Sequence, residues 1–234
     1  MKNYLKNFFK GLSIIIFYFT FNYLLLYILN LLKINPSKWN ELYQVIYLLS
    51  VSIFILLVIL FIYRKEIKIE FKDFKINFKT YFKEYKKYWP IMLLLMMLSS
   101  VIISPFTKNL PQNEELIRTT LQRSLPYLIY ICVSASLIAP LTEELVFRKS
   151  IKKMVPENTL FIILSGLVFG LAHVMNSTTQ LEYLYILSYS IPGFVFAYVY
   201  NKSNNIFVSV SIHFFHNTLL LIIQLLLMNG GILW

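Results

Sequence analysis

The strongest constraint on the fold is the arrangement of apolar residues in blocks of about 20, the length that crosses a bilayer as a helix. The sequence is 58% hydrophobic and only 14% charged, against about 25% charged residues in a typical soluble domain. We therefore predict an all-α, polytopic transmembrane helical bundle of about seven spans, forming a single integral membrane domain over residues 1–234. The predicted spans are residues 11–32, 44–63, 89–106, 125–150, 159–175, 181–200 and 206–228.

The distribution of lysine and arginine predicts the orientation of this bundle. With a cytoplasmic N-terminus, the loops place 17 basic residues inside and 5 outside, in agreement with the positive-inside rule. The C-terminus is then expected outside, with an eighth spanning or re-entrant segment around residues 108–124 as the alternative. The apolar run after Lys10 is too long for a signal peptide and no cleavage site follows it, so we expect it to be retained as the first span. The expected location is the cell membrane, as a multi-pass protein.

The net charge of +11 has a cause that does not involve nucleic acid. Basic cytoplasmic loops are attracted to anionic headgroups, so the expected partner of this charge is membrane lipid. Within the N-terminal spans, residues 1–107, the segment 64–87 alternates Lys with Phe, Tyr and Ile. This pattern fits either an amphipathic stretch on the headgroups or a solvated basic loop. Residues 112–124 are predicted to form a short polar helix on the outer face.

Ionisable side chains inside a span are costly to bury, so they indicate a functional site. The fourth span carries two adjacent acids, Glu143 and Glu144, followed by Arg148. All 3 histidines of the protein lie in later spans. The polar or aromatic candidates from these later spans are Phe169, His173, His213, His216 and Asn217.

Helical spacing predicts which of these side chains share a face. Glu144 and Arg148 are four residues apart and can form an ion pair, whereas Glu143 points about 100° away and is left for a second role. The same spacing pairs Phe169 with His173 and His213 with Asn217.

Two further features concern helix packing. Gly166 and Gly170 form a small-xxx-small pair, which lets the fifth span approach a neighbouring helix closely. Pro140 lies one turn before the glutamates and is expected to loosen or kink the fourth span. Three helices could therefore bring two acids, two imidazoles and an amide to one point.

These groups suit the activation of water. A carboxylate can act as general base, and histidine as a second base, an acid or a metal ligand. An Asn amide together with a His can donate hydrogen bonds to a developing oxyanion. Glu143, His173 and His213 would also form an acceptable Zn²⁺ ligand set with an open position for water. The residues leave the cofactor open between none and a divalent metal.

The ordered motifs Glu-Glu-x-x-x-Arg, Phe-x-x-x-His and His-x-x-x-Asn, each in its own span, resemble the CAAX-prenyl-protease and bacteriocin-processing (CPBP) family of intramembrane glutamic or metallo-peptidases. The resemblance covers roughly residues 125–220 and suggests a catalytic core over residues 125–228. It implies catalytic roles for the positions that match the family motifs, with Arg148 and Phe169 in support. The matching catalytic positions are Glu143, Glu144, His173, His213 and Asn217.

The resemblance implies an intramembrane endopeptidase that hydrolyses a peptide bond of a membrane-associated protein or peptide. We assign Glu143 as the base that activates water, assisted by His173, and Glu144 to positioning through Arg148. His213 and Asn217 are assigned to stabilising the oxyanion.

Other interpretations of the same residues remain. The Glu144–Arg148 pair alone could be a structural clamp, and buried His or Asn side chains often only join helices; His216 is expected to be structural. The whole chain could be a non-proteolytic scaffold, regulator or immunity protein of the same family, or a small transporter. A paired-aspartate site is excluded because Asp73 is the single aspartate, and no Gly-x-Ser-x-Gly or His-Glu-x-x-His motif occurs.

The spacing also predicts where the site opens. Counting from Thr159, His173 lies about 20 Å along the fifth span, whereas Glu143 lies nearer the cytoplasmic side. For the two groups to meet, the fourth helix must continue past Arg148 to about Lys152. We expect this extension, and a cavity open to the cytoplasm.

Overall fold

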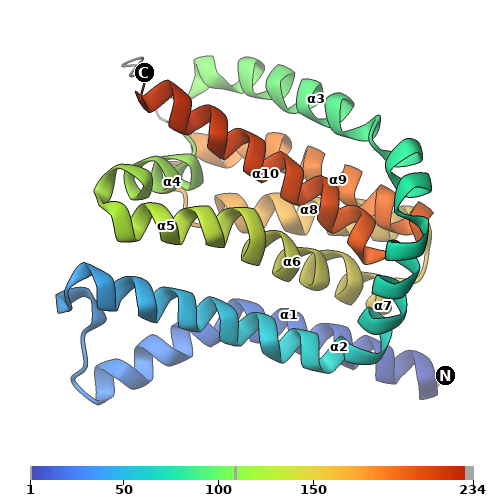
Figure 1. Ribbon diagram of the computed structural model, residues 1–234, viewed down its shortest axis with the longest axis horizontal. Coiled ribbons are helices and arrows are strands. Elements are labelled where there is room, and N and C mark those ends of the chain that lie inside the picture. The colour runs from blue at the N-terminus through green and yellow to red at the C-terminus, as the bar shows by residue number, and fades with distance from the viewer. Residues whose placement is uncertain (1, 108–109, 230–234) are drawn as a thin grey trace.

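The computed structural model describes residues 2–107 and 110–229, and within these ranges every regular element is helical. Each of the seven predicted spans forms helix, which confirms the all-α bundle (Figure 1). The helices are α1 (Lys2–Leu31), α2 (Glu41–Tyr85), α3 (Tyr88–Ile103), α4 (Gln112–Arg123), α5 (Leu125–Val133), α6 (Ala139–Glu143), α7 (Ile151–Met154), α8 (Asn158–Val174), α9 (Ile186–Ser203) and α10 (Ile206–Asn229). Shorter segments are η1 (Pro36–Lys38), η2 (Ser104–Phe106), η3 (Ser134–Ile138), η4 (Glu144–Ser150) and η5 (Leu181–Tyr185).

Length and composition make the protein a multi-pass membrane protein. Six of the described helices are long and apolar enough to cross a bilayer, and α8 is a shorter apolar helix of 17 residues. Helix α4 is the predicted short polar helix and is not among the candidate spans. Residues 108–109, which include the Lys108 counted on the outer side, lie outside the described residues.

The fourth predicted span is one rod, Leu125–Met154, assembled from α5, η3, α6, η4 and α7. Both η3 and η4 are π-helical and they flank the turn that contains Pro140. Because proline has no N–H to donate, the turn before it cannot keep the regular α-helical ladder, and a wider turn results. The predicted loosening at Pro140 is therefore present, and the rod extends past Arg148 as expected.

Helix α2 is 45 residues long, about 68 Å, which is far more than a bilayer core requires. Its second half, residues 64–85, turns away and crosses the ends of neighbouring helices (Figure 1). Lys149 at the end of the rod pairs with Glu70, and Asn205 between α9 and α10 donates to the backbone oxygen of Glu70 at 2.7 Å. The basic segment is thus a docked helix, and its interpretation as a loop is wrong.

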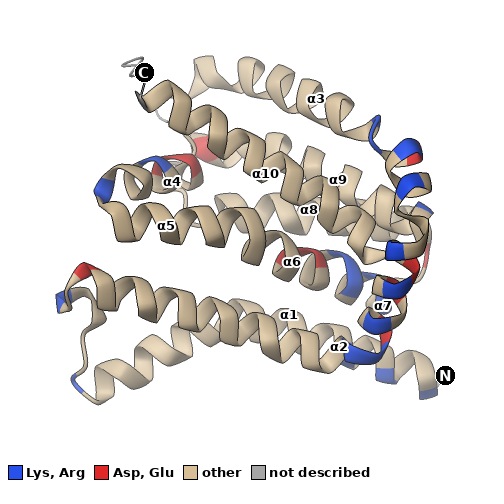
Figure 2. Cartoon of the chain, viewed as in Figure 1, with Lys and Arg blue, Asp and Glu red and all other residues tan. Residues whose placement is uncertain are grey.

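Charged residues gather mainly at one end of the bundle, which we call the basic end (Figure 2). It contains the start of α1, the second half of α2, and α7, with ion pairs that link all three. Glu66 accepts from Lys10 at 3.4 Å and from Lys153 at 3.0 Å. Successive spanning segments run alternately toward and away from this end (Figure 1).

Helix α8 starts near the basic end with a capping side chain. The backbone N–H groups of Leu160 and Thr159 donate to the Glu157 carboxylate, and these bonds hold the pKa of Glu157 below its usual range. The cap satisfies N–H groups that would otherwise lack partners at the helix start.

Helices α8 and α9 approach each other through glycine. A Cβ at Gly193 would lie 2.8 Å from the Cα and the backbone oxygen of Gly166, and a Cβ at Gly170 would lie 2.8 Å from the backbone oxygen of Ile186. This is the close approach predicted from the Gly166–Gly170 pair. It determines how α8 presents Phe169 and His173 to the interior.

The variant Gly193→Ala should lower stability by about 1–3 kcal/mol, because the added methyl meets backbone that can only move with its helix. The measurement is the unfolding midpoint in detergent, followed by circular dichroism. Leu187→Ala is the control, since Leu187 lies on the same helix and is 59% exposed. A Gly193→Ala midpoint equal to that of wild type would contradict the packing described.

Candidate functional site

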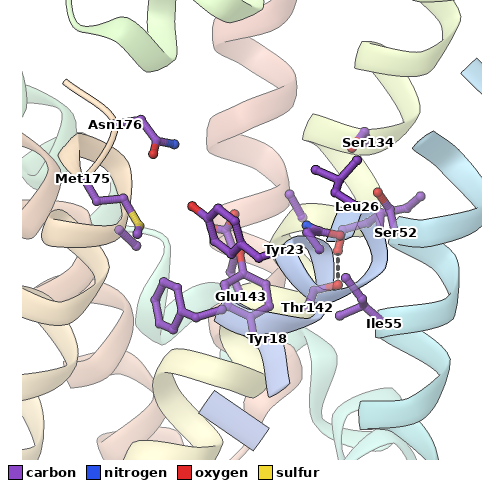
Figure 3. A pocket seen from close by; sticks show the side chains of 15 residues that line it. Tyr18, Tyr23, Leu26, Ser52, Ile55, Ser134, Thr142, Glu143, Met175 and Asn176 are labelled. Carbon is purple, nitrogen blue, oxygen red and sulfur yellow. Dashed lines mark hydrogen bonds between the residues drawn. The ribbon is translucent and has the colours of Figure 1, made fainter. Parts of the chain in front are cut away.

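Glu143 lies at the wall of a cavity of about 500 Å³ between α1, α2 and the rod Leu125–Met154. Its side chain is 14% exposed, in contrast to the fully buried Glu144 beside it. Figure 3 shows Glu143 among Tyr18, Tyr23 and Thr142. The lining is otherwise uncharged: Tyr18, Phe19, Asn22, Tyr23, Leu26, Ser52, Ile55, Ser134, Ile138, Ala139, Thr142, Ala172, Met175 and Asn176.

Glu144 faces away from the cavity and has three partners that satisfy its carboxylate. Ser209 on α10 donates its hydroxyl hydrogen to Oε2, and His213 Nδ1 donates to Oε1 at 2.9 Å. Arg148 Nε lies 3.2 Å from Oε2. A buried carboxylate is tolerated only with such pairing, so Glu144 holds α10 against the rod.

His213 joins the two glutamates. Because its Nδ1 carries the hydrogen donated to Glu144, the neutral ring has a free lone pair at Nε2. That Nε2 lies 3.8 Å from Glu143 Oε2. Because both atoms are acceptors in this state, a hydrogen bond between them requires a proton on one of the two. The ring also stacks on Phe196, with centroids 4.6 Å apart, and this contact limits its orientation.

Arg148 is fully buried, and its charge is balanced by one carboxylate and two aromatic rings. The guanidinium lies over the rings of Phe169 and Phe196, 4.4 Å and 5.3 Å from their centroids. Its Nε is within ion-pair distance of Glu144, yet none of its three nitrogens meets hydrogen-bond geometry with a described residue. Cation–π contact and the Glu144 charge are therefore its main stabilising interactions.

His173 approaches the same group from α8. Its Nδ1 donates to the backbone oxygen of Phe169 at 2.8 Å, which leaves Nε2 as an acceptor. The ring is held between Phe169 and Tyr189, with centroid distances of 4.4 Å and 4.9 Å. Phe169 also contacts the ring of His213, with centroids 5.8 Å apart, so the two imidazoles lie on either side of one phenyl ring.

Asn217 lies one turn beyond His213 and serves a different contact. Its Nδ2 donates to the backbone oxygen of Ala135 in η3 at 2.9 Å, joining α10 to the π-helical turn. His216 is buried, and its Nδ1 has no hydrogen-bond partner among the described residues. Of the predicted residues, Glu143, Glu144, Arg148, Phe169, His173 and His213 come together, and Asn217 is at their edge.

The candidate metal ligands Glu143, His173 and His213 do not form a ready metal site. Among the described residues, no three His, Cys, Asp or Glu side chains are arranged to hold an ion. The chemistry of the donors suits zinc, since both Nε2 atoms are free, but their placement does not.

Two kinds of residue at the candidate site escape the sequence motifs. Ser209 precedes His213 by four residues, so the i,i+4 repeat that pairs His213 with Asn217 could have identified it. Tyr18 and Asn22 line the cavity from α1, far from the motifs in sequence, and no local signal marks them.

Comparison with known proteins supports the motif assignment. Residues 124–219 match the model of a family described as type II CAAX prenyl endopeptidase Rce1-like. The chain is 30% identical over 117 residues to "Putative membrane peptidase YdiL" of Bacillus subtilis (strain 168), covering 49% of this chain and 43% of that protein. It is 34% identical over 77 residues to "UPF0177 protein YxdF" of Lactococcus lactis subsp. lactis (strain IL1403), covering 33% of this chain and 40% of that protein.

These matches span less than half the length of either relative. No solved structure matches the chain.

The variant Arg148→Met should destabilise the protein by about 3–5 kcal/mol, because Glu144 would keep a buried charge without its cation. The double variant Glu144→Gln/Arg148→Met removes both charges and should recover part of that loss. The measurement is again the unfolding midpoint in detergent. If the double variant were no more stable than Arg148→Met, lost packing rather than an uncompensated charge would explain the effect.

Proposed function

We propose that this protein is an intramembrane endopeptidase, because residues 124–219 match the family model described as type II CAAX prenyl endopeptidase Rce1-like. Its substrate would be a membrane-associated protein or peptide. One observation supports the proposal most directly. Among the described residues, Glu143 is the single charged side chain that lines the cavity. His213 lies next to it and is held by a hydrogen bond to the buried Glu144.

Glu143 is the general base of the proposed reaction. It is partly exposed, so a water molecule in the cavity can reach it, and it has no arginine partner. The base takes a proton from this water while the oxygen attacks the scissile carbonyl. Positioned acid–base groups of this kind contribute about 10²–10⁴-fold to rate.

His213 and Glu144 act together behind the base. A carboxylate bonded to Nδ1 fixes the ring orientation and stabilises an imidazolium, the arrangement used in hydrolase triads. When Glu143 passes the proton of the attacking water to Nε2, the imidazolium can donate to the oxyanion and then deliver that proton to the departing amine. Glu144 therefore positions His213, a role beyond the pairing with Arg148 predicted from the sequence.

His173 and Asn217 have supporting roles. The free Nε2 of His173 can accept a hydrogen bond from the attacking water and align it with Glu143. One N–H of the Asn217 amide donates to the backbone oxygen of Ala135, so the second N–H can donate to the oxyanion.

The variant Glu143→Gln should lower cleavage at least about 10²-fold, because the amide cannot accept a proton. The measurement is mass spectrometry of protein N-termini in membranes from cells that express each variant. N-termini that depend on the wild-type protein should disappear with Glu143→Gln and persist with the control Glu115→Gln, an exposed residue of α4. Identical N-termini in all three samples, at equal expression, would favour the scaffold or immunity function.

A peptide that spans one such cleavage site tests the metal question directly. The purified protein should cleave it after extensive treatment with a chelator, because the proposed chemistry needs only side chains. Loss of cleavage on chelation, with recovery on adding Zn²⁺, would contradict this mechanism and make Glu143, His173 and His213 ligands.

A further inference from the structure

The cavity extends from Glu143 away from the basic end of the bundle. In α1, which starts at the basic end, the lining residues Tyr18, Tyr23 and Leu26 belong to the distant half. Met175 and Asn176 line it immediately after α8 has ended. A second cavity of about 400 Å³ shares Leu26 and continues along the end of α1. The cavity therefore opens on the side of Glu143 that is opposite to the basic end.

The opposite side of Glu143 is closed by packed side chains. All 7 residues of η4, from Glu144 to Ser150, are buried. Phe147 is 1% exposed, packs against Tyr18 and Phe169, and its backbone oxygen accepts from Ser165 at 2.7 Å.

Polar contacts reinforce this closure nearer the basic end. Tyr63 and Ser150 share a hydrogen bond of 2.9 Å, and the Lys149–Glu70 pair follows. A peptide could not pass between these groups without unfolding the centre of the bundle.

The distribution of charge identifies the closed side as cytoplasmic. The basic end holds the lysines of α1, α2 and α7, and basic residues are retained on the cytoplasmic side of spanning helices (Figure 2). The cavity mouth is then on the extracytoplasmic side.

The lining indicates what kind of segment could enter. Its rim is apolar or aromatic and accessible, with Tyr23 62%, Leu26 51% and Met175 40% exposed. Polar groups of the lining, such as the exposed Asn22 and the partly buried Ser134, can bond a peptide backbone. A volume of about 500 Å³ fits a short extended segment rather than a folded domain.

We propose that the substrate enters from the extracytoplasmic half of the membrane, as an uncharged segment of an exported or membrane-spanning peptide. This inference rests on the proposed function and specifies its substrate class. A cytoplasmic tail would have to cross the closed η4 region to reach Glu143, whereas an extracytoplasmic segment meets the accessible rim first.

Thiol labelling tests the access route without any need for activity. Cys132 is the single cysteine, so Cys132→Ala provides a background for Asn22→Cys and Ser134→Cys. A small membrane-impermeant maleimide should label both cysteines in intact cells. The control Lys79→Cys, on the exposed face of α2, should be labelled only in inside-out vesicles. Labelling after denaturation shows that each thiol is present.

The outcomes separate the two proposals. Labelling of Asn22→Cys and Ser134→Cys from the cytoplasmic side alone, or from neither side, overturns the access route and leaves the peptidase proposal standing. If both cysteines are labelled from outside but no cleavage depends on Glu143, the access route stands and the peptidase proposal is overturned. If both hold, the N-termini that depend on Glu143 should fall in uncharged stretches on the extracytoplasmic side, and N-termini in cytoplasmic tails would contradict the substrate class.

Discussion

The buried carboxylate of Glu144 is the constraint on which the rest of the site depends. A charge at that depth requires partners, and it takes them from two helices: Arg148 on its own rod, and Ser209 and His213 on α10. These contacts fix the rotation of α10 about its axis and hold His213 in one orientation. They also pack Arg148 against Phe169 of α8, so three helices meet at one charge.

The adjacent glutamates acquire different roles from this arrangement. Glu144 is fully enclosed, whereas Glu143 points to the cavity and keeps a surface that water can reach. The wide π-helical turn that starts at Glu144 lets both side chains be accommodated while the rod continues toward the basic end. In the proposed hydrolysis, the accessible carboxylate activates water and the buried one positions His213.

Much of the fold follows from local sequence. Blocks of about 20 apolar residues predict the spans, because a bilayer leaves a helix few alternatives. Intramembrane charge likewise identifies Glu143, Glu144 and Arg148. The π-helical turns on both sides of Pro140 depend on tertiary packing, and the sequence predicts only a loosened helix there. The change of direction in α2 also depends on packing, and the sequence shows only a basic segment.

The direction in which the cavity opens cannot be predicted from local sequence. Its direction depends on α1 packing against η4 and α7 near the basic end, a long-range contact without a sequence signature. For the same reason Tyr18 and Asn22 could not be assigned to the site from the sequence, and the proposed access route differs from the cytoplasmic opening that was expected. The hydrogen bond from His213 to Glu144, which is present in addition to the Glu144–Arg148 pair, likewise depends on the relative rotation of two helices.

The tautomer of His213 is the most direct test of this account, because it reports whether Glu144 holds the ring toward Glu143. Nitrogen-15 NMR of histidine-labelled protein in detergent can measure it, with the His213 signals assigned by their absence in His213→Gln. The account predicts that Nδ1 of His213 carries a hydrogen, which Glu144 accepts. A neutral ring protonated at Nε2 would mean that Glu144 does not hold His213, and would contradict the account.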